Sequence, residues 1–226
     1  MTLCLFLTAY QEDAASDLDR DWLDAGLAEV HGVRELILHL PFAFGQGDPH
    51  LVAAEPPRCV IQLYFPSLAA LEQALVRQGP LARLLTRAEL TGYHWTQQAM
   101  LVRSFMPAAG ASQRSTGVTY LVEYDGHSAD DDHWLACYLR QHPPLLALLP
   151  GVRAVEVYTR LDYCSDLPIA RARVLQRNKA VFDCAAALAT ALASPQRDRL
   201  REDFLSLPTF TGTSPHYPMQ SVARLP

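Results

Sequence analysis

Two segments of the sequence recur at nearly the same spacing, which indicates an internal duplication. Residues 65–75 (FPSLAALEQAL) resemble residues 182–192 (FDCAAALATAL), 117 positions later. The tripeptide Gly-Val-Arg at 32–34 recurs at 151–153, 119 positions later. Apolar helices share such patterns by chance, so neither match is decisive alone. Together, at nearly one offset, they predict a tandem repeat.

The order of expected elements also repeats. In the first half, strands are expected at 3–10, 34–42, 59–65 and 96–105, with helices at about 16–30 and 66–85. In the second half, strands are expected at 117–124, 151–160, 179–183 and 216–225, with helices from 133 and from 185, and a loop over 161–177. Each half therefore has the order β-α-β-β-α-β. The pattern-free stretch 106–117 is predicted to be a linker between domains 1–105 and 118–226.

This order predicts an α+β fold made of two tandem ferredoxin-like βαββαβ units. Each unit has a four-stranded antiparallel sheet with helices on one face. The other face carries apolar residues that are unfavourable in water. Two units in one chain can bury these faces against each other, so we expect an intramolecular α+β barrel with its helices outside.

Composition limits the classes of function. Half of the 226 residues are hydrophobic, and the net charge of −5 comes from 24 acidic residues against 18 arginines and the single lysine, Lys179. No long block is strongly basic and no apolar run approaches the roughly 18 residues of a membrane helix, so we expect neither nucleic acid nor membrane as a partner. Five scattered cysteines without a Cys-x-x-Cys pair favour free thiols in the cytoplasm. Whether the barrel forms homo-oligomers is left open.

The helix from His133 carries one polar residue on its apolar side. Trp134, Tyr138 and neighbouring leucines share an arc at helical spacing, and His142 falls in the middle of that arc. Asp130 to Asp132 suit the helix N-terminus, and this capping role is a better account of three consecutive carboxylates than a metal site. Pro143 and Pro144 are expected to end the helix directly after His142.

The same stretch resembles the EthD-like group of the dimeric α+β barrel superfamily. The motif is W-x₃-Y-x₃-H-P-x-L-x₃-LPGV, present as Trp134, Tyr138, His142-Pro143, Leu145 and 149–152. The resemblance implies a cofactor-independent enzyme of isomerase, cyclase, dehydratase or monooxygenase type. Its substrate would be a small hydrophobic molecule, aromatic-derived or a lactone, in a degradation or biosynthetic pathway.

His142 is the first candidate catalytic residue, as a general acid or base. The competing interpretation is that its ring caps backbone carbonyls at the helix end. In the first half, the segment before Gly32 is seven positions shorter than the one before Gly151 and has no counterpart of His142. The first half is therefore expected to be a structural mate without its own site.

Glu156 and Tyr158 share one face of their strand and are candidate catalytic partners. A carboxylate among tyrosines inside a barrel would have a raised pKa and could act as a base. The favoured alternative is that both residues sit near a strand end, with the charged group reaching solvent. His39, at the position equivalent to Tyr158, suggests that this place in the sheet tolerates polar groups in both halves.

Tyr124, Trp134, Tyr138 and His39 are the candidate substrate-binding residues. For Trp134 and Tyr138, packing in the core is the favoured alternative, because aromatic residues four positions apart are what a packed helix needs.

Two other functions remain open at this stage. One is a non-catalytic binding or accessory protein whose barrel is purely structural. The other is a haem protein with His142 as axial ligand, which is the weakest alternative because no basic patch for the propionates flanks the motif. No metal site is expected, since no zinc spacing, phosphate-binding glycine loop or nucleophile elbow occurs.

Overall fold

The computed structural model describes residues 1–11, 20–45, 47–50, 55–87, 92–105 and 116–224. The first half contains β1 (Leu3–Gln11), α1 (Arg20–Leu27), β2 (Glu35–Pro41), β3 (Cys59–Phe65), α2 (Leu68–Ala74), α3 (Pro80–Leu85) and β4 (Tyr93–Phe105). The second half contains β5 (Gly117–Ser128), α4 (Asp131–Leu146), β6 (Ala154–Arg160), β7 (Ala170–Arg171), β8 (Gln176–Phe182), α5 (Ala185–Leu192), α6 (Pro195–Ser206), β9 (Phe210–Thr213) and β10 (His216–Arg224). The predicted β-α-β-β-α-β order is confirmed in both halves.

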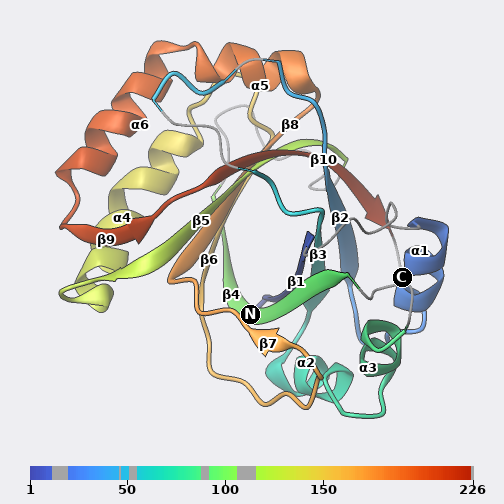
Figure 1. The fold of residues 1–226 in the computed structure, drawn as a ribbon. Coiled ribbons are helices and arrows are strands. Elements are labelled where there is room, and N and C mark those ends of the chain that lie inside the picture. Colours follow the sequence, from blue (N-terminus) through green and yellow to red (C-terminus); the bar gives the residue numbers. More distant parts are fainter. Residues whose placement is uncertain (12–19, 46, 51–54, 88–91, 106–115, 225–226) are drawn as a thin grey trace.

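In the described part of the chain, eight strands close into an antiparallel barrel with the helices outside (Figure 1). Each half contributes four strands, in the order β4-β1-β3-β2 and β10-β5-β8-β6. The halves join twice, where β10 pairs with β2 and where β4 pairs with β6. The predicted fold, an α+β barrel made within one polypeptide, is confirmed.

Strand register confirms the repeat residue by residue. Leu36 pairs with Leu63 in the first half, and Val155 pairs with Ala180 in the second, which preserves the offsets of 119 and 117. Gly32 and Gly151 both hold a positive φ, 80° and 75°, at the turn that leads into the next strand. A side chain with a Cβ strains that conformation, which explains why glycine stands at both positions.

The two faces of the sheet have different surroundings. Alternate residues of each strand point outward beneath the helices, as Tyr120 and Tyr124 do on β5, while the intervening residues, such as Leu121, fill the barrel. Leucine dominates the layer between sheet and helices in the first half. The interior of the barrel combines apolar side chains with a set of fully buried polar ones. Any two residues on opposite faces of the sheet therefore belong to different sites.

The predicted end of the helix at His142 is wrong. α4 continues through Pro143 and Pro144 to Leu146, although prolines lack the amide proton that the helix uses. Trp134, Tyr138, His142 and Leu146 form one buried stripe at intervals of four residues. Burial of this stripe outweighs the hydrogen bonds that the two prolines remove, so His142 lies one turn inside the helix.

Other boundaries also differ from the prediction, of which three matter here. β8 begins at Gln176 instead of Lys179, and the expected loop 161–177 contains the short strand β7. The helix expected over 66–85 is divided into α2 and α3, with Gly79 capping the second. α1 spans Arg20–Leu27 within the expected range of 16–30, whose residues 16–19 lie outside the described part, as do residues 106–115 of the predicted linker.

The acidic run before α4 caps the helix as predicted. The carboxylate of Asp130 accepts a hydrogen bond from the backbone N–H of His133 at 2.9 Å, and Asp131 accepts one from the N–H of Ser128 at 2.8 Å. In the described part of the chain, no helix combines the length and the apolar character needed to cross a bilayer.

Candidate functional site

The sequence-predicted site residues fall into two groups on opposite faces of the sheet. His142, Tyr124, Trp134 and Tyr138 lie in the layer between the sheet and the helices α4 and α6. The other three, Glu156, Tyr158 and His39, lie inside the barrel. The structure therefore does not bring Glu156 and Tyr158 to His142, and the two groups have to be considered separately.

His142 is fixed by a carboxylate that the sequence did not single out. Its Nδ1 lies 2.8 Å from Oδ2 of Asp203 on α6, and both side chains are nearly buried, with exposed fractions of 8% and 12%. A carboxylate accepts, so Nδ1 carries the proton in the neutral ring. Nε2 then holds the lone pair, and no described residue forms a hydrogen bond with it. The predicted alternative, a ring that caps backbone carbonyls, does not match this geometry.

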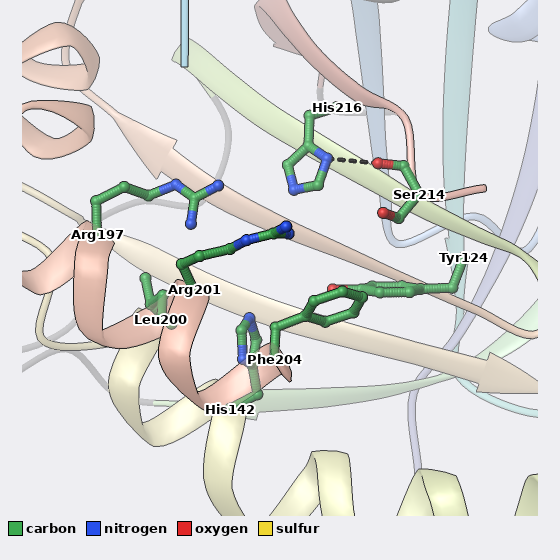
Figure 2. Close-up of a pocket in the computed structure, with 8 residues that line it drawn as sticks. All are labelled: Tyr124, His142, Arg197, Leu200, Arg201, Phe204, Ser214 and His216. Carbon is green, nitrogen blue, oxygen red and sulfur yellow. Dashed lines mark hydrogen bonds between the residues drawn. The ribbon is translucent and has the colours of Figure 1, made fainter. Parts of the chain in front are cut away.

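A hollow borders the His142 ring (Figure 2). Its lining consists of Tyr124, His142, Arg197, Leu200, Arg201, Phe204, Ser214 and His216. The enclosed space is about 30 Å³, which is room for one water-sized group. A second cavity of about 30 Å³ adjoins it beneath α5 and shares His142, Arg197 and His216, but its remaining wall is mainly apolar. Any larger ligand has to move side chains of α6.

Two further ring groups in the hollow are held neutral. Burial lowers the pKa of His216 to about 4, against the hydrogen bond from its Nδ1 to the carbonyl of Ser214, which raises it. Its Nε2 can therefore accept a hydrogen bond near pH 7. Burial raises the pKa of Tyr124 to about 12, so that its hydroxyl remains a donor. The low pKa makes His216 a weak base, and Tyr124 keeps its proton.

One wall of the hollow is anchored by the first half of the chain. Oδ2 of Asp48, in the segment after β2, lies 2.8 Å from Nε of Arg197 and accepts a hydrogen bond from the hydroxyl of Tyr120 at 2.9 Å. Burial would raise the pKa of Asp48, but these hydrogen bonds and the charge of Arg197 lower it below its ordinary value. Nε2 of His50 lies 2.8 Å from Oδ1 of Asp198, which is a second contact between the same two segments.

Glu156 and Tyr158 belong to a sealed polar cluster inside the barrel. Oε2 of Glu156 lies 3.1 Å from Nζ of Lys179 and accepts hydrogen bonds from Tyr158 at 2.7 Å and Tyr64 at 2.8 Å. Lys179 also donates to Gln62 at 3.0 Å. Because Tyr64 and Gln62 lie on β3, this cluster ties the first half to the second.

Two sequence predictions about Glu156 are wrong. Its exposed fraction is 1%, so the charged group does not reach solvent. Burial alone would raise the pKa of Glu156, but the Lys179 ammonium and the two tyrosine hydroxyls lower it to about 2. A carboxylate held so firmly ionised is a poor base, and we assign the cluster to folding rather than to catalysis.

His39 extends the same interior network. Its Nδ1 lies 2.7 Å from the hydroxyl of Ser221 on β10, and its Nε2 lies 2.8 Å from Oε1 of Gln62. Burial and the nearby Lys179 lower the pKa of His39 to about 3, so that the ring is neutral. The sequence correctly places a polar group at this position, but the residue has no access to a ligand in this structure.

Trp134 and Tyr138 are fully buried against the outer face of β5. Their rings stack with centroids 5.2 Å apart, and the Tyr138 ring lies 4.8 Å from that of His142. Neither residue lines the two cavities. They support the position of the His142 ring through packing.

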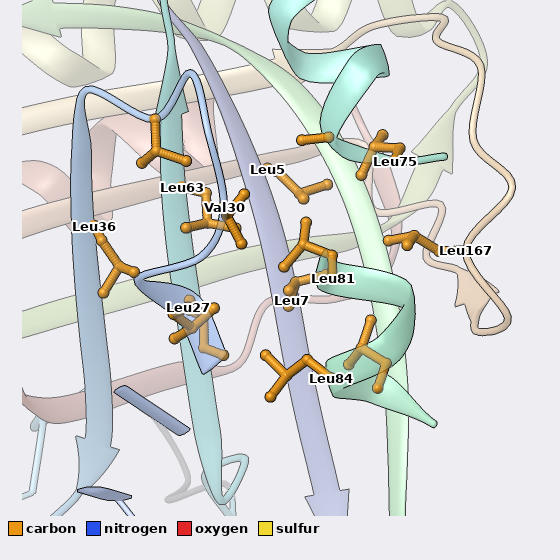
Figure 3. Close-up of a cluster of buried hydrophobic side chains, with 14 of the residues drawn as sticks. Leu5, Leu7, Leu27, Val30, Leu36, Leu63, Leu75, Leu81, Leu84 and Leu167 are labelled. Carbon is orange, nitrogen blue, oxygen red and sulfur yellow. The ribbon is translucent and has the colours of Figure 1, made fainter. Parts of the chain in front are cut away.

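The equivalent place in the first half is packed with apolar side chains. Leucine side chains from the sheet and from α1, α2 and α3 fill it, as Figure 3 shows for Leu5, Leu63 and Leu81. The contrast supports the prediction that the first half lacks a site of its own.

Several residues of the site have no sequence signal of their own. Asp203 and Arg197 lie in a strongly charged helix whose pattern resembles a solvated surface, and Asp48 lies in a loop. Arg177 was missed as a barrel residue because the polar start of β8 was interpreted as a loop, whereas Lys179 lies in the expected strand 179–183 but was not recognised as a residue of the barrel interior. The alternation of Val60, Gln62 and Tyr64 on β3 could have placed the last two inside the barrel.

Comparisons with known proteins show the fold. No protein-family profile and no curated protein matches this chain. Among solved structures, an anthrone oxidase-like protein superposes with a TM-score of 0.62 at 14% identity, covering 99% of this chain and 92% of that one. Candidate monooxygenases from Fusobacterium nucleatum (TM-score 0.55, 9% identity, 99% and 94% covered) and Lactobacillus acidophilus (TM-score 0.53, 10% identity, 100% and 99% covered) also match. The chain therefore has the dimeric α+β barrel fold over its full length.

Proposed function

We propose that this protein is an EthD-like enzyme that removes a proton from a small hydrophobic molecule, with His142 as the general base. The observation that carries this proposal is the His142–Asp203 pair. Asp203 holds the Nδ1 proton, so that the unpartnered Nε2 is the basic atom beside the hollow. A carboxylate in this position orients the ring and stabilises its protonated form.

The names of proteins with the same fold support an aromatic ketone or lactone as the substrate. Three solved structures with this fold carry names of an anthrone oxidase-like protein or a candidate monooxygenase. An anthrone has an acidic methylene group next to two aromatic rings. Removal of that proton gives an electron-rich enolate. Removal of a proton next to a carbonyl group is also the first step of isomerisation, cyclisation or dehydration.

The haem alternative fits this site poorly. The sequence shows no basic patch for the haem propionates beside the motif, but in the structure Arg197 and Arg201 of α6 line the hollow beside His142. However, the space at the imidazole is about 30 Å³, far below the volume of a macrocycle. A Soret band in the purified protein would restore this alternative.

Localisation in a reducing compartment such as the cytoplasm is part of the proposal. No disulfide links the five cysteines, all of which lie in the described part of the chain. Free thiols are typical of reducing compartments.

The test uses anthrone together with a panel of aromatic ketones and lactones. We expect the wild type to accelerate oxygen uptake or isomerisation for at least one compound. His142→Asn should lower that rate by about 10²- to 10⁴-fold, the range for loss of a general base. His133→Asn is the matched control, because His133 lies on the same helix with an exposed side chain. Equal rates for His142→Asn and wild type would contradict the proposal, and inactivity on the whole panel would favour the non-catalytic binding protein.

A further inference from the structure

Arg197 is a buried cation with only one edge in use. Its exposed fraction is 8%, and its Nε donates to Asp48 at 2.8 Å. Neither Nη atom forms a hydrogen bond with a described residue. The side chain is largely removed from solvent, and its Nη donors are available to a ligand or a water molecule that reaches them.

The unused edge of Arg197 faces the hollow beside His142. Figure 2 shows the guanidinium, the His142 ring and the His216 ring directed at the same space. Arg201 lines that space as well and forms no ion pair with a described residue. No carboxylate is among the described residues that line it. The carboxylates of Asp48 and Asp203 lie behind this lining, paired with Arg197 and His142, and balance much of the charge of the two guanidiniums. The Nη edge of Arg197 and the guanidinium of Arg201 are the donors that an anionic group in the hollow would meet.

We infer that the Nη edge of Arg197 is a binding site for the carboxylate of a small aromatic acid, placed next to the base His142. The two Nη atoms form a fork whose spacing matches the two oxygens of a carboxylate. The adjoining apolar cavity, lined in part by Leu146, Phe182 and Leu188, holds only about 30 Å³, so the aromatic ring of the molecule has to lie on the α6 side, where Arg201 and Phe204 give way to it. This inference names the substrate class of the proposed enzyme and depends on the proposed function only in the role given to His142.

The first half of the chain contributes to this anion site through Asp48. Asp48 fixes Nε of Arg197 and thereby turns the Nη edge toward the hollow, so Asp48 is a positioning residue contributed from outside the second half. Tyr120 holds the same carboxylate oxygen from β5. The first half is thus more than the structural mate that the sequence suggests, since the anion site is incomplete without it.

The ligand enters from the side of α6 that is open to solvent. Arg201 and Phe204 form that side and are only partly buried, with the Arg201 guanidinium 5.9 Å from the Phe204 ring centroid. These two side chains can move without breaking an ion pair to a described residue. The rigid part of the site, Arg197 with Asp48, stays in place.

Binding of benzoate to the full-length protein tests the inference without any turnover. We expect saturable binding in a calorimetric titration, and none for the neutral analogue benzamide at the same concentrations. The double variant Arg197→Gln with Asp48→Asn replaces the buried ion pair by two amides, so that no buried charge is left alone. It should weaken benzoate binding by at least about tenfold. Arg199→Gln is the matched control, because Arg199 is an exposed arginine on the same helix.

The outcomes separate this inference from the proposed function. His142→Asn should keep benzoate affinity within about threefold of wild type, whatever it does to turnover. Benzoate affinity that is unchanged in the folded double variant would overturn the inference, even if His142→Asn abolishes turnover. No saturable binding of benzoate up to about 10 mM would overturn it as well. Loss of binding in Arg201→Gln but not in the double variant would move the anion site to Arg201 and contradict the assignment.

Discussion

Nδ1 of His142 lies 2.8 Å from Oδ2 of Asp203, although 61 positions of sequence separate them. α4 and α6 pack side by side on the second half of the barrel, and this contact links the two helices together with the hydrogen bond from Nε2 of Gln196 to the carbonyl of Leu145 at 2.9 Å. The carboxylate determines which nitrogen carries the proton, so a catalytic role for His142 depends on it.

Asp203→Asn should therefore impair any reaction that uses His142 as base. The amide can present its nitrogen to Nδ1, which favours the wrong tautomer, and it cannot stabilise the protonated ring. We expect turnover to fall by between about tenfold and 10⁴-fold, the larger figure being the cost of the same change in a serine-protease triad. Steady-state rates on the compound that the wild type converts provide the measurement. Glu202→Gln, an exposed neighbour on α6, should leave the rate unchanged.

Lys179→Met should destabilise the protein strongly, because it leaves the carboxylate of Glu156 inside the barrel without the ammonium group that balances its charge. Breaking one partner of a buried pair costs about 3–5 kcal/mol of the free energy of unfolding. The double variant Lys179→Met with Glu156→Gln should recover a large part of that loss, since neither residue of this pair then carries a buried charge. Urea denaturation of both variants measures the difference. Equal stability of the single and double variants would show that the pair is not coupled.

Acid should weaken the fold in two stages. The pKa of His39 is about 3 in the folded protein against an ordinary value of 6.5, so the unfolded chain binds more protons between these values. The free energy of unfolding should fall by up to about 1.4 kcal/mol per pH unit as the pH decreases from 6.5 toward 3. Below pH 4.5, the ordinary pKa of a glutamate, Glu156 takes up a proton in the unfolded chain but not in the folded protein. The free energy of unfolding therefore decreases further, until the pH reaches the folded pKa of about 2.

His39→Gln removes the contribution of His39 to the first of these stages. Glutamine keeps hydrogen-bonding groups for Ser221 and Gln62 but does not titrate, so the stability profile should become shallower between pH 6.5 and 5 and keep the slope that His216, with its pKa of about 4, contributes. Urea denaturation at several pH values is the measurement, and His127→Gln, at an exposed position, is the control. A profile parallel to that of the wild type would refute the assignment to His39.

Thiol reactivity should follow burial. Burial raises the pKa of Cys4 well above its ordinary value, and the residue is fully buried, so it should not react with DTNB in the folded state. Cys164 and Cys184 are exposed and should react quickly. Counting modified thiols before and after unfolding in urea distinguishes these groups. Rapid labelling of Cys4 in the native protein would show that the barrel opens.

The sequence predicted the barrel because the repeat and the alternation of each strand are local patterns. Residues separated by the two offsets, 117 and 119, form equivalent strand pairings in the two halves. The buried stripe of α4 follows the helical spacing of Trp134, Tyr138 and His142. The polar start of β8 and the prolines of α4 were misjudged because packing in the folded state outweighed local preference. Arg177, for example, lies in a strand and forms an ion pair with Glu123 at 2.8 Å inside the barrel.

The site was only partly accessible to such reasoning. His142 stood out because a histidine on an apolar stripe is unusual, but no local pattern connects it to Asp203 or connects Arg197 to Asp48. These contacts join α4 to α6 and the first half to the second, so they depend on how the halves assemble. Glu156 and Tyr158 were grouped with His142 because sequence alternation shows that residues share a face, but does not show which face of the barrel it is.

The nitrogen NMR spectrum of the His142 ring in the presence and absence of benzoate tests the central claim most directly. We expect that in the neutral form of the ring the proton lies on Nδ1, which faces Asp203, and that the resonance of Nε2 moves saturably as benzoate is added. Asp203→Asn should disturb this tautomer, whereas His133→Asn should not. A ring protonated at Nε2, or one whose resonances ignore benzoate at every concentration, would contradict it.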